Sequence, residues 1–129
     1  MAVSYLKRNS SPQQTVFSQE DWSSAYCNVD KELDQVELKL VYGSIPKQIA
    51  GTFYRNGPGR LERGGRWVHH PFDGDGMIAA FKFEHGKIKL TNRFVRTKEW
   101  KEEEESKKFL YRGVFGTQKE GGVLANAFD

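Results

Sequence analysis

The 129-residue chain is poor in the residues that usually hold transition metals, with one cysteine, Cys27, and three histidines. A single cysteine excludes an internal disulfide and any cysteine metal cluster, and it fits a reducing compartment. No apolar run approaches the ~18 residues that a membrane-spanning helix needs. Met1 to Gln14 also lacks the apolar stretch of a secretory signal. We therefore expect a cytoplasmic protein.

An excess of charge of one sign is also missing. The chain has 20 basic and 17 acidic residues, which gives a formal net charge of +3 with the two signs interspersed. This balance gives little support to nucleic-acid binding. A small basic binder could use the cations of Arg55 to Arg66, with Tyr54 and Trp67 for stacking on bases. Nucleic-acid binding is the weakest of the three functional hypotheses that the sequence suggests.

Aromatic residues and glycines are what the chain does have. Aromatics make up 13% of the residues, and 13 glycines interrupt the sequence. Aromatic and β-branched residues punctuated by glycine favour short strands and tight turns over long helices. The length suits one domain. We predict an all-β fold, with a short helix opening at Ser18–Asp21 and a short charged helix near 98–108.

The strand pattern is clearest between residues 77 and 94. Met77, Ala79, Phe81 and Phe83 alternate along one strand, a turn follows at 84–87, and apolar residues alternate again on the return, which predicts a hairpin. Other strands are expected at 36–40, 52–54 and 109–115, with a turn at 56–59 and a polar connection at 60–66. In the charged helix, Glu103–Lys107 and Glu104–Lys108 have the i, i+4 spacing of a solvated face.

Two ordered segments stand out, Gly51 to Gly59 and His70 to Met77. From the residues alone, each is a strand end next to a tight turn, with Asp and Asn side chains bound to nearby amides. Calcium is a poor fit to Asp73-Gly74-Asp75-Gly76, because strand residues follow where further ligands are needed. The segment from Gly57 to Gly65 lacks the Gly-Lys-Ser/Thr ending of a phosphate loop.

The histidines do not predict a metal site. His69 and His70 are neighbours, so in an extended segment their side chains point to opposite faces. His85 falls in the expected turn at the far end of a strand from Asp75. Three imidazoles placed in this way cannot surround one ion. No serine stands in a strand-to-helix elbow either, so we expect no catalytic and no metal-binding residue in this segment.

Three segments nevertheless follow one another in a specific order: Gly43-Ser44-Ile45-Pro46, Arg55-Asn56-Gly57-Pro58 and His70-Pro71-Phe72-Asp73-Gly74-Asp75-Gly76-Met77. This series resembles the opening signature of the carotenoid oxygenase family. Downstream, Phe94-Val95-Arg96-Thr97 and Tyr111-Arg112-Gly113-Val114-Phe115-Gly116 are similar to the cyanobacterial apocarotenoid-cleaving members. The resemblance covers roughly residues 35–129, with residues 1–34 as a lead-in.

The resemblance implies a seven-bladed β-propeller, of which this chain would supply the first one or two blades. It also implies Fe(II) held by four histidines that match no position here, and O2 cleavage of a carotenoid or apocarotenoid to aldehyde products such as retinal. Expected partners are that substrate, the remaining carboxy-terminal blades and, peripherally, a membrane. The segment alone is expected to be inactive and poorly soluble. The resemblance gives a structural role to the signature residues Arg55, Asn56, Gly57, Pro58, His70, Phe72, Asp73, Gly74, Asp75, Gly76 and Met77.

The second hypothesis is a non-catalytic module that binds an apolar polyene or pairs its open strand edge with another polypeptide. Copurification of a histidine-rich partner would favour it over the enzymatic hypothesis.

Overall fold

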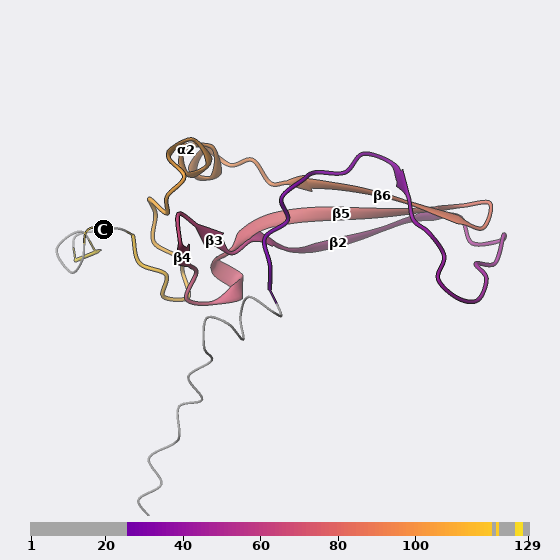
Figure 1. Cartoon of the computed structure of the whole chain (residues 1–129), viewed down its shortest axis with the longest axis horizontal. Coiled ribbons are helices and arrows are strands. Elements are labelled where there is room, and N and C mark those ends of the chain that lie inside the picture. Colours follow the sequence, from indigo (N-terminus) through magenta and orange to yellow (C-terminus); the bar gives the residue numbers. More distant parts are fainter. Residues whose placement is uncertain (1–25, 120, 122–125, 128–129) are drawn as a thin grey trace, which may run out of the picture.

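The structure is a computed structural model that describes residues 26–119, 121 and 126–127, so the helix expected at Ser18–Asp21 lies outside the described residues. A mostly-β fold is confirmed. Its elements, in chain order, are β1 (Val36–Glu37), β2 (Gly51–Arg60), β3 (Glu62–Arg63), β4 (Arg66–Trp67), the 3-10 helix η1 (Pro71–Asp73), β5 (Asp75–Glu84), β6 (Lys87–Phe94) and α2 (Lys98–Ser106) (Figure 1).

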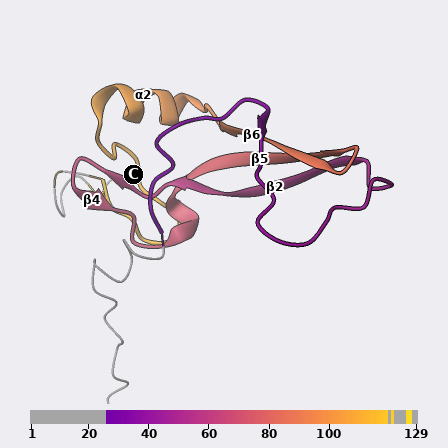
Figure 2. The same cartoon turned by 45° about the vertical axis from the view of Figure 1, so that its right-hand side comes forward.

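A four-stranded antiparallel sheet in the order β1-β6-β5-β2 forms most of the molecule. The strands β2, β5 and β6 run side by side as a long ribbon, with α2 and β3–β4 at one end and the β5–β6 turn at the other (Figures 1 and 2). That turn consists of His85 and Gly86, which have φ values of 52° and 77°. Two residues of positive φ match the twist of a hairpin, so the predicted hairpin is confirmed.

The strand β2 is longer than predicted. The turn expected at Asn56–Gly59 is wrong, because β2 continues through these residues and Pro58 pairs with Gly76 of β5. A proline fits here because β2 lies at the sheet edge, where one missing amide donor breaks no second ladder. Gly59 occupies a register shift between Pro58 and Arg60. An added Cβ at Gly59 would lie 2.8 Å from the Met77 Cβ, so glycine lets the strands approach closely.

Side-chain alternation gives the sheet two unlike faces. One, which we call the apolar face, carries Phe53, Met77, Phe81, Phe83, Ile88, Leu90 and Phe94. The other, which we call the basic face, carries Thr52, Tyr54, Ile78, Ala80, Lys82, Lys89, Thr91 and Arg93. The shared face predicted for alternate residues of 77–83 is therefore confirmed. Met77 and Phe94 are the buried members of the apolar face.

The half-buried strand expected at 36–40 is wrong over most of its length. Val36 and Glu37 pair with β6, and the Leu38 amide donates to the Ile88 carbonyl at 2.9 Å. Beyond that bond the chain leaves the sheet. Leu40 remains 49% exposed, and Gly43 turns the backbone with a φ of 80°. The alternating pattern fails because its apolar side chains have little of the described structure to pack against.

The connection expected at 60–66 instead contains the hairpin β3–β4, which turns at Gly64 and Gly65 with φ values of 57° and 82°. The buried core lies beside this hairpin. It consists of Leu61, Val68 and Phe109, with Trp67 packed against them. Arg63 is also buried, with 4% of its surface exposed. The sequence analysis expected a polar connection here and did not predict a buried arginine.

The charged helix is confirmed as α2. Thr97 caps its amino end, accepting a hydrogen bond from the Trp100 amide at 3.1 Å, and Trp100 stacks on Phe94 at 5.6 Å between ring centroids. The helix is not solvated all round, however. Glu103 is 6% exposed and lies 3.7 Å from the Arg63 guanidinium, while Lys107 pairs with Glu104 in place of Glu103. None of the described helices is long and apolar enough to cross a membrane.

The strand expected at 109–115 is wrong, because this segment is irregular. Carboxylates bind its backbone amides, which in a strand would join a ladder. The Glu103 carboxylate accepts from the amides of Leu110 and Tyr111 at 2.9 and 3.0 Å. The Asp73 carboxylate accepts from the Phe115 amide at 2.8 Å. These side-chain contacts replace sheet pairing.

Candidate functional site

The two sequence motifs form one structural unit. In the β2–β5 ladder, Arg55 pairs with Ala79, Asn56 with Ile78, Gly57 with Met77 and Pro58 with Gly76. An open groove of about 480 Å3 lies between them, with residues of both motifs in its walls. Arg55 and Asn56 are exposed there. Phe72 from η1 stands beside them with 73% of its surface exposed.

His70 introduces η1 and acts as its amino-terminal cap. Its Nδ1 accepts a hydrogen bond from the Phe72 amide at 3.1 Å. The imidazole stacks on Phe115 and meets Phe72 edge-on, each at 4.9 Å between ring centroids. The Nδ1 hydrogen bond holds His70 in its own turn, and stacking on Phe115 joins that turn to the loop 113–117.

Asp73, at the end of η1, binds the loop 113–117. Its carboxylate accepts hydrogen bonds from the Phe115 amide, the Thr117 amide at 3.0 Å and the Thr117 hydroxyl at 2.7 Å. Desolvation raises the pKa of Asp73, but these hydrogen bonds and nearby His70 outweigh it and hold the pKa below its ordinary value of 3.8. A Cβ at Gly113 would clash with the Asp73 carboxyl group, so the loop needs glycine there.

Asp75, two residues on, lies in a cluster of buried charges. The Arg63 guanidinium donates to its carboxylate at 2.6 Å and to the Glu104 carboxylate at 2.7 Å, and the Arg63 side chain is 1% exposed. Arg60 adds a second cation, 3.5 Å from Glu104. Burial raises the pKa of Asp75, and Arg63 opposes that rise without cancelling it. For Glu104, desolvation is outweighed by hydrogen bonds from Lys107 and Arg63, and its pKa is lowered.

Sequence reasoning missed the partners of Asp75 in this cluster, which are Arg60, Arg63, Glu103 and Glu104. Arg63 was placed in a polar connection, and Glu103 belongs to a run of four glutamates with no local signal that separates it from its neighbours. Through Arg63 the cluster joins β5, β3 and α2, and Glu103 passes that restraint on to the amides of Leu110 and Tyr111. Asp73 therefore contacts the loop 113–117 directly, whereas Asp75 reaches the segment 109–111 only through Arg63 and Glu103.

At the glycine positions of the signature, the room around the backbone determines whether a side chain would fit. A Cβ at Gly74 would come within 2.7 Å of the Leu61 Cδ2 and 2.8 Å of the Arg60 carbonyl, so a larger residue does not fit. At Gly76 the nearest atom would be Val95 Cγ2 at an ordinary 3.5 Å, and at Gly57 nothing lies within 4 Å. Met77 is buried in the sheet.

The described residues do not fit an iron site. His69 is exposed and gives its backbone amide to the Thr117 hydroxyl at 2.7 Å. His70 uses Nδ1 as a cap, and His85 lies in the β5–β6 turn at the opposite end of β5 from Asp75. Across the described ranges, no group of three or more His, Cys, Asp or Glu side chains is placed to hold a metal ion.

Comparison with known proteins identifies the family. Residues 26–129 match the family model described as retinal pigment epithelial membrane protein. The chain is 49% identical over 121 residues to the apocarotenoid-15,15'-oxygenase of Synechocystis, which covers 93% of this chain and 24% of that protein. It is 34% identical over 95 residues to a probable carotenoid cleavage dioxygenase 4 of Arabidopsis thaliana, covering 72% of this chain and 16% of that protein. The crystal structure of cobalt-substituted Synechocystis apocarotenoid oxygenase superposes with a TM-score of 0.78 at 48% identity, over 87% of this chain and 23% of that one.

The chain therefore belongs to the carotenoid oxygenase family, as its motifs predicted. It spans about a quarter of the length of the Synechocystis relative.

Proposed function

We propose that this chain supplies the amino-terminal part of a non-haem iron oxygenase that uses O2 to cleave a conjugated double bond of a carotenoid or apocarotenoid, giving aldehyde products of the retinal kind. The observation that carries the proposal is 49% identity over 121 residues to an apocarotenoid-15,15'-oxygenase. The described fold supports it, because the same segment superposes on that type of enzyme with a TM-score of 0.78.

The architecture proposed for the whole protein is a seven-bladed β-propeller, with residues 1–34 as a lead-in and residues 35–129 as its first one or two blades. The β1-β6-β5-β2 sheet supports this assignment, since a propeller blade is a four-stranded antiparallel sheet. The apolar face has the composition expected of a surface that packs against a neighbouring blade, with exposed Phe53 at 58%.

The role proposed for the signature residues is structural. Asp73 binds the loop 113–117 to η1, Asp75 positions Arg63, and His70 caps the turn that presents Asp73. Because the described residues do not fit a metal, we assign them no step of the oxygenation. The Fe(II) of the family would be held by histidines elsewhere in the polypeptide, and O2 and the polyene are its substrates. We place the protein in the cytoplasm, in peripheral contact with membranes.

A chimera tests the proposal. Residues 26–129 of this chain would replace the matching segment of the Synechocystis apocarotenoid-15,15'-oxygenase. We expect the chimera to melt cooperatively, retain iron and convert an apocarotenal to shorter aldehydes separable by chromatography. The same chimera with Lys101→Gln, a change on an exposed residue of α2, should behave identically.

A folded, iron-loaded chimera that cleaves no apocarotenal would contradict the proposal. So would a chimera that cleaves isoeugenol but no polyene, because an isoeugenol monooxygenase of Pseudomonas nitroreducens is also 41% identical to this chain over 80 residues.

A further inference from the structure

The start of the described chain crosses the sheet at the end that lies near β3 (Figures 1 and 2). On the β2 side, the Val29 amide donates to the Gly59 carbonyl at 2.7 Å. On the β6 side, the Asn92 amide donates to the Leu33 carbonyl at 3.1 Å. Residues 29–33 therefore pass over β5, which lies between β2 and β6. They occupy this end of the apolar face, so a neighbouring blade is left the part toward the β5–β6 turn.

An open groove of about 390 Å3 lies beside this crossing segment. Met77 and Ala79 of β5 line it from the sheet, and Val29 lines it from the crossing segment. Tyr26, the first described residue, is also part of its wall. The groove is therefore bounded by the chain's own amino-terminal part and by the apolar face.

Asn28 fixes the point at which the amino-terminal part reaches the groove. Its side-chain oxygen accepts from the Leu61 and Glu62 amides at 2.7 and 3.1 Å. Its side-chain nitrogen donates to the Glu62 carbonyl at 3.0 Å. Three hydrogen bonds from one side chain thus hold the backbone two residues after Tyr26. Residues 17–25, which we call the amino-terminal segment, are consequently attached at the edge of the groove.

Arg55 is the cation of this groove. It pairs with Ala79 across the β2–β5 ladder, so its side chain lies on the apolar face, and it is exposed there. It forms no hydrogen bond or ion pair with any residue that the structure describes. A guanidinium beside apolar side chains favours an occupant that combines an apolar group with a carboxylate.

The amino-terminal segment has this combination of groups. Glu20 and Asp21 directly precede Trp22, and no basic residue occurs between positions 9 and 30. Trp22 stands four residues before Tyr26, a spacing that places two side chains on the same side of a helix, about 6 Å apart along its axis. Because Tyr26 lines the groove, a helix that continues backward from it brings Trp22 to the same groove.

From these contacts we propose that the amino-terminal segment docks in this groove. Trp22 packs against the apolar side chains that line it, and the carboxylate of Asp21 or Glu20 pairs with Arg55. The occupant is a part of the same chain, so the groove needs no separate partner. Docking gives Arg55 an electrostatic role within the signature and makes the amino-terminal segment part of the folded domain. The inference concerns packing and is independent of the oxygenase activity proposed above.

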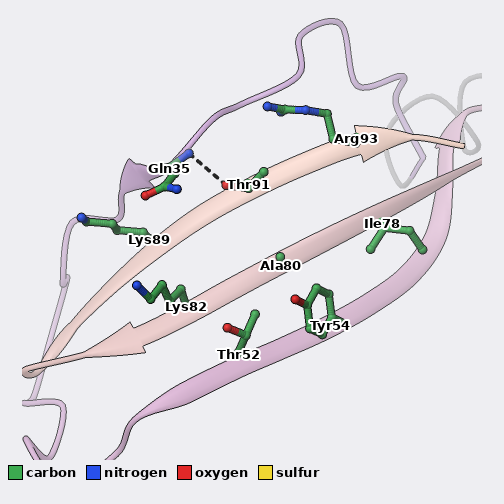
Figure 3. A pocket seen from close by; sticks show the side chains of 9 residues that line it. All are labelled: Gln35, Thr52, Tyr54, Ile78, Ala80, Lys82, Lys89, Thr91 and Arg93. Carbon is green, nitrogen blue, oxygen red and sulfur yellow. Dashed lines mark hydrogen bonds between the residues drawn. The ribbon is translucent and has the colours of Figure 1, made fainter. Parts of the chain in front are cut away.

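The first test is zero-length cross-linking in the full-length protein. Arg55→Lys keeps the positive charge and supplies an amine that a carbodiimide joins to a carboxylate in contact with it. We expect mass spectrometry of the digested protein to show an amide bond between position 55 and position 20 or 21. Tyr54→Lys is the matched control, because Tyr54 is the next residue along β2 and lies on the basic face (Figure 3). It should give no such bond.

The second test is limited proteolysis of the full-length protein with chymotrypsin, followed through release of residues 1–22. Cleavage of a segment that opens transiently tracks the population of its open form. Arg55→Gln removes the charge pair and should accelerate cleavage after Trp22 about fivefold. Arg55→Lys should restore the original rate. Lys101→Gln, which removes an exposed charge from α2, should leave the rate within about twofold.

Two results would overturn the inference. One is the absence of a bond between position 55 and positions 20 or 21 in Arg55→Lys. The other is equal cleavage rates after Trp22 in Arg55→Gln and Lys101→Gln. Cross-links that join Glu20 or Asp21 only to lysines beyond residue 129 would assign the amino-terminal segment to another part of the polypeptide and would equally overturn it.

Discussion

Asp73 and Thr117 are joined by two hydrogen bonds across 44 positions of sequence, one from the threonine amide at 3.0 Å and one from its hydroxyl at 2.7 Å. The same hydroxyl accepts from the His69 amide at 2.7 Å. This contact closes the loop 113–117 onto the turn that precedes β5. It links the signature motif directly to the carboxy-terminal part of the described chain.

Asp73→Asn should loosen that loop. The amide keeps an acceptor oxygen but loses the charge, and charge-assisted hydrogen bonds are roughly twice as strong as neutral ones. We expect the free energy of unfolding to fall by about 1–2 kcal/mol. Hydrogen exchange at the Phe115 and Thr117 amides should accelerate. Asp30→Asn, at an exposed position, is the control, and unchanged exchange at both amides would contradict the structure.

The pKa of Asp73 should lie below 3.8 and the pKa of Asp75 above 3.8. Desolvation opposes ionisation of Asp73, but hydrogen bonds from Phe115 and Thr117 lower its pKa, whereas burial raises the pKa of Asp75 despite Arg63. Carboxyl carbon chemical shifts followed by NMR against pH would measure both. An Asp75 midpoint below that of Asp73 would refute the assignment.

These directions have opposite consequences for stability. A lowered folded pKa gives Asp73 a contribution that is present above 3.8 and is lost as the pH falls from 3.8 through the folded pKa. A raised folded pKa means that Asp75 binds its proton more readily in the folded state than in the unfolded state. The ionised Asp75 therefore destabilises the folded state at high pH, and this destabilisation is lost as the pH falls through the folded pKa toward 3.8. Urea unfolding across this range should show a shallower acid loss for Asp73→Asn than for the unchanged protein.

Arg63→Met should be among the most damaging single substitutions. It removes the cation that pairs with Asp75, Glu103 and Glu104 and leaves the buried Glu103 carboxylate without its cation, while Arg60 remains beside Asp75 and Glu104. Breaking a buried ion pair from one side costs about 3–5 kcal/mol. Denaturant unfolding would measure the loss. Lys31→Met removes one exposed charge and should change the free energy of unfolding by less than about 0.5 kcal/mol.

Gly113→Ala should destabilise the loop through a steric clash. The new methyl group would meet the Asp73 carboxylate, which cannot retreat without losing its hydrogen bonds. Overpacking of this kind costs about 1–3 kcal/mol. Gly57→Ala is the matched control, because nothing lies within 4 Å of its added Cβ. Equal melting temperatures for the two variants would show that the loop does not pack as described.

The parts of this fold that sequence predicts are those with local causes. The β5–β6 hairpin follows from alternation on both sides of a turn, and α2 follows from its helix composition. The motif at 70–77 was also found, because its glycines and aspartates leave a pattern in a short window. What alternation could not predict was that β2 would run straight through Asn56–Gly59, since only its position at the sheet edge makes Pro58 acceptable.

The rest of the candidate site depends on contacts between distant segments. Arg63 is 12 positions from Asp75 and 41 from Glu104, and nothing local distinguishes Glu103 from the glutamates beside it. The segment 109–115 has strand composition, yet carboxylates from α2 and η1 take its amides. Such partners are chosen by tertiary packing, which overrides local propensity.

The ladder that pairs Arg55–Pro58 with Gly76–Ala79 limits where the chain can change its length. Inserting or deleting one residue inside β5 would slide its pairing by one step and turn side chains such as Phe81 to the opposite side of the sheet, and the same change inside β2 would reverse side chains such as Phe53. The hairpin turn at Gly64 and Gly65 lies outside that ladder and can absorb such changes. Homologous chains should therefore vary in length between β3 and β4 while keeping a constant count of residues within β2 and β5.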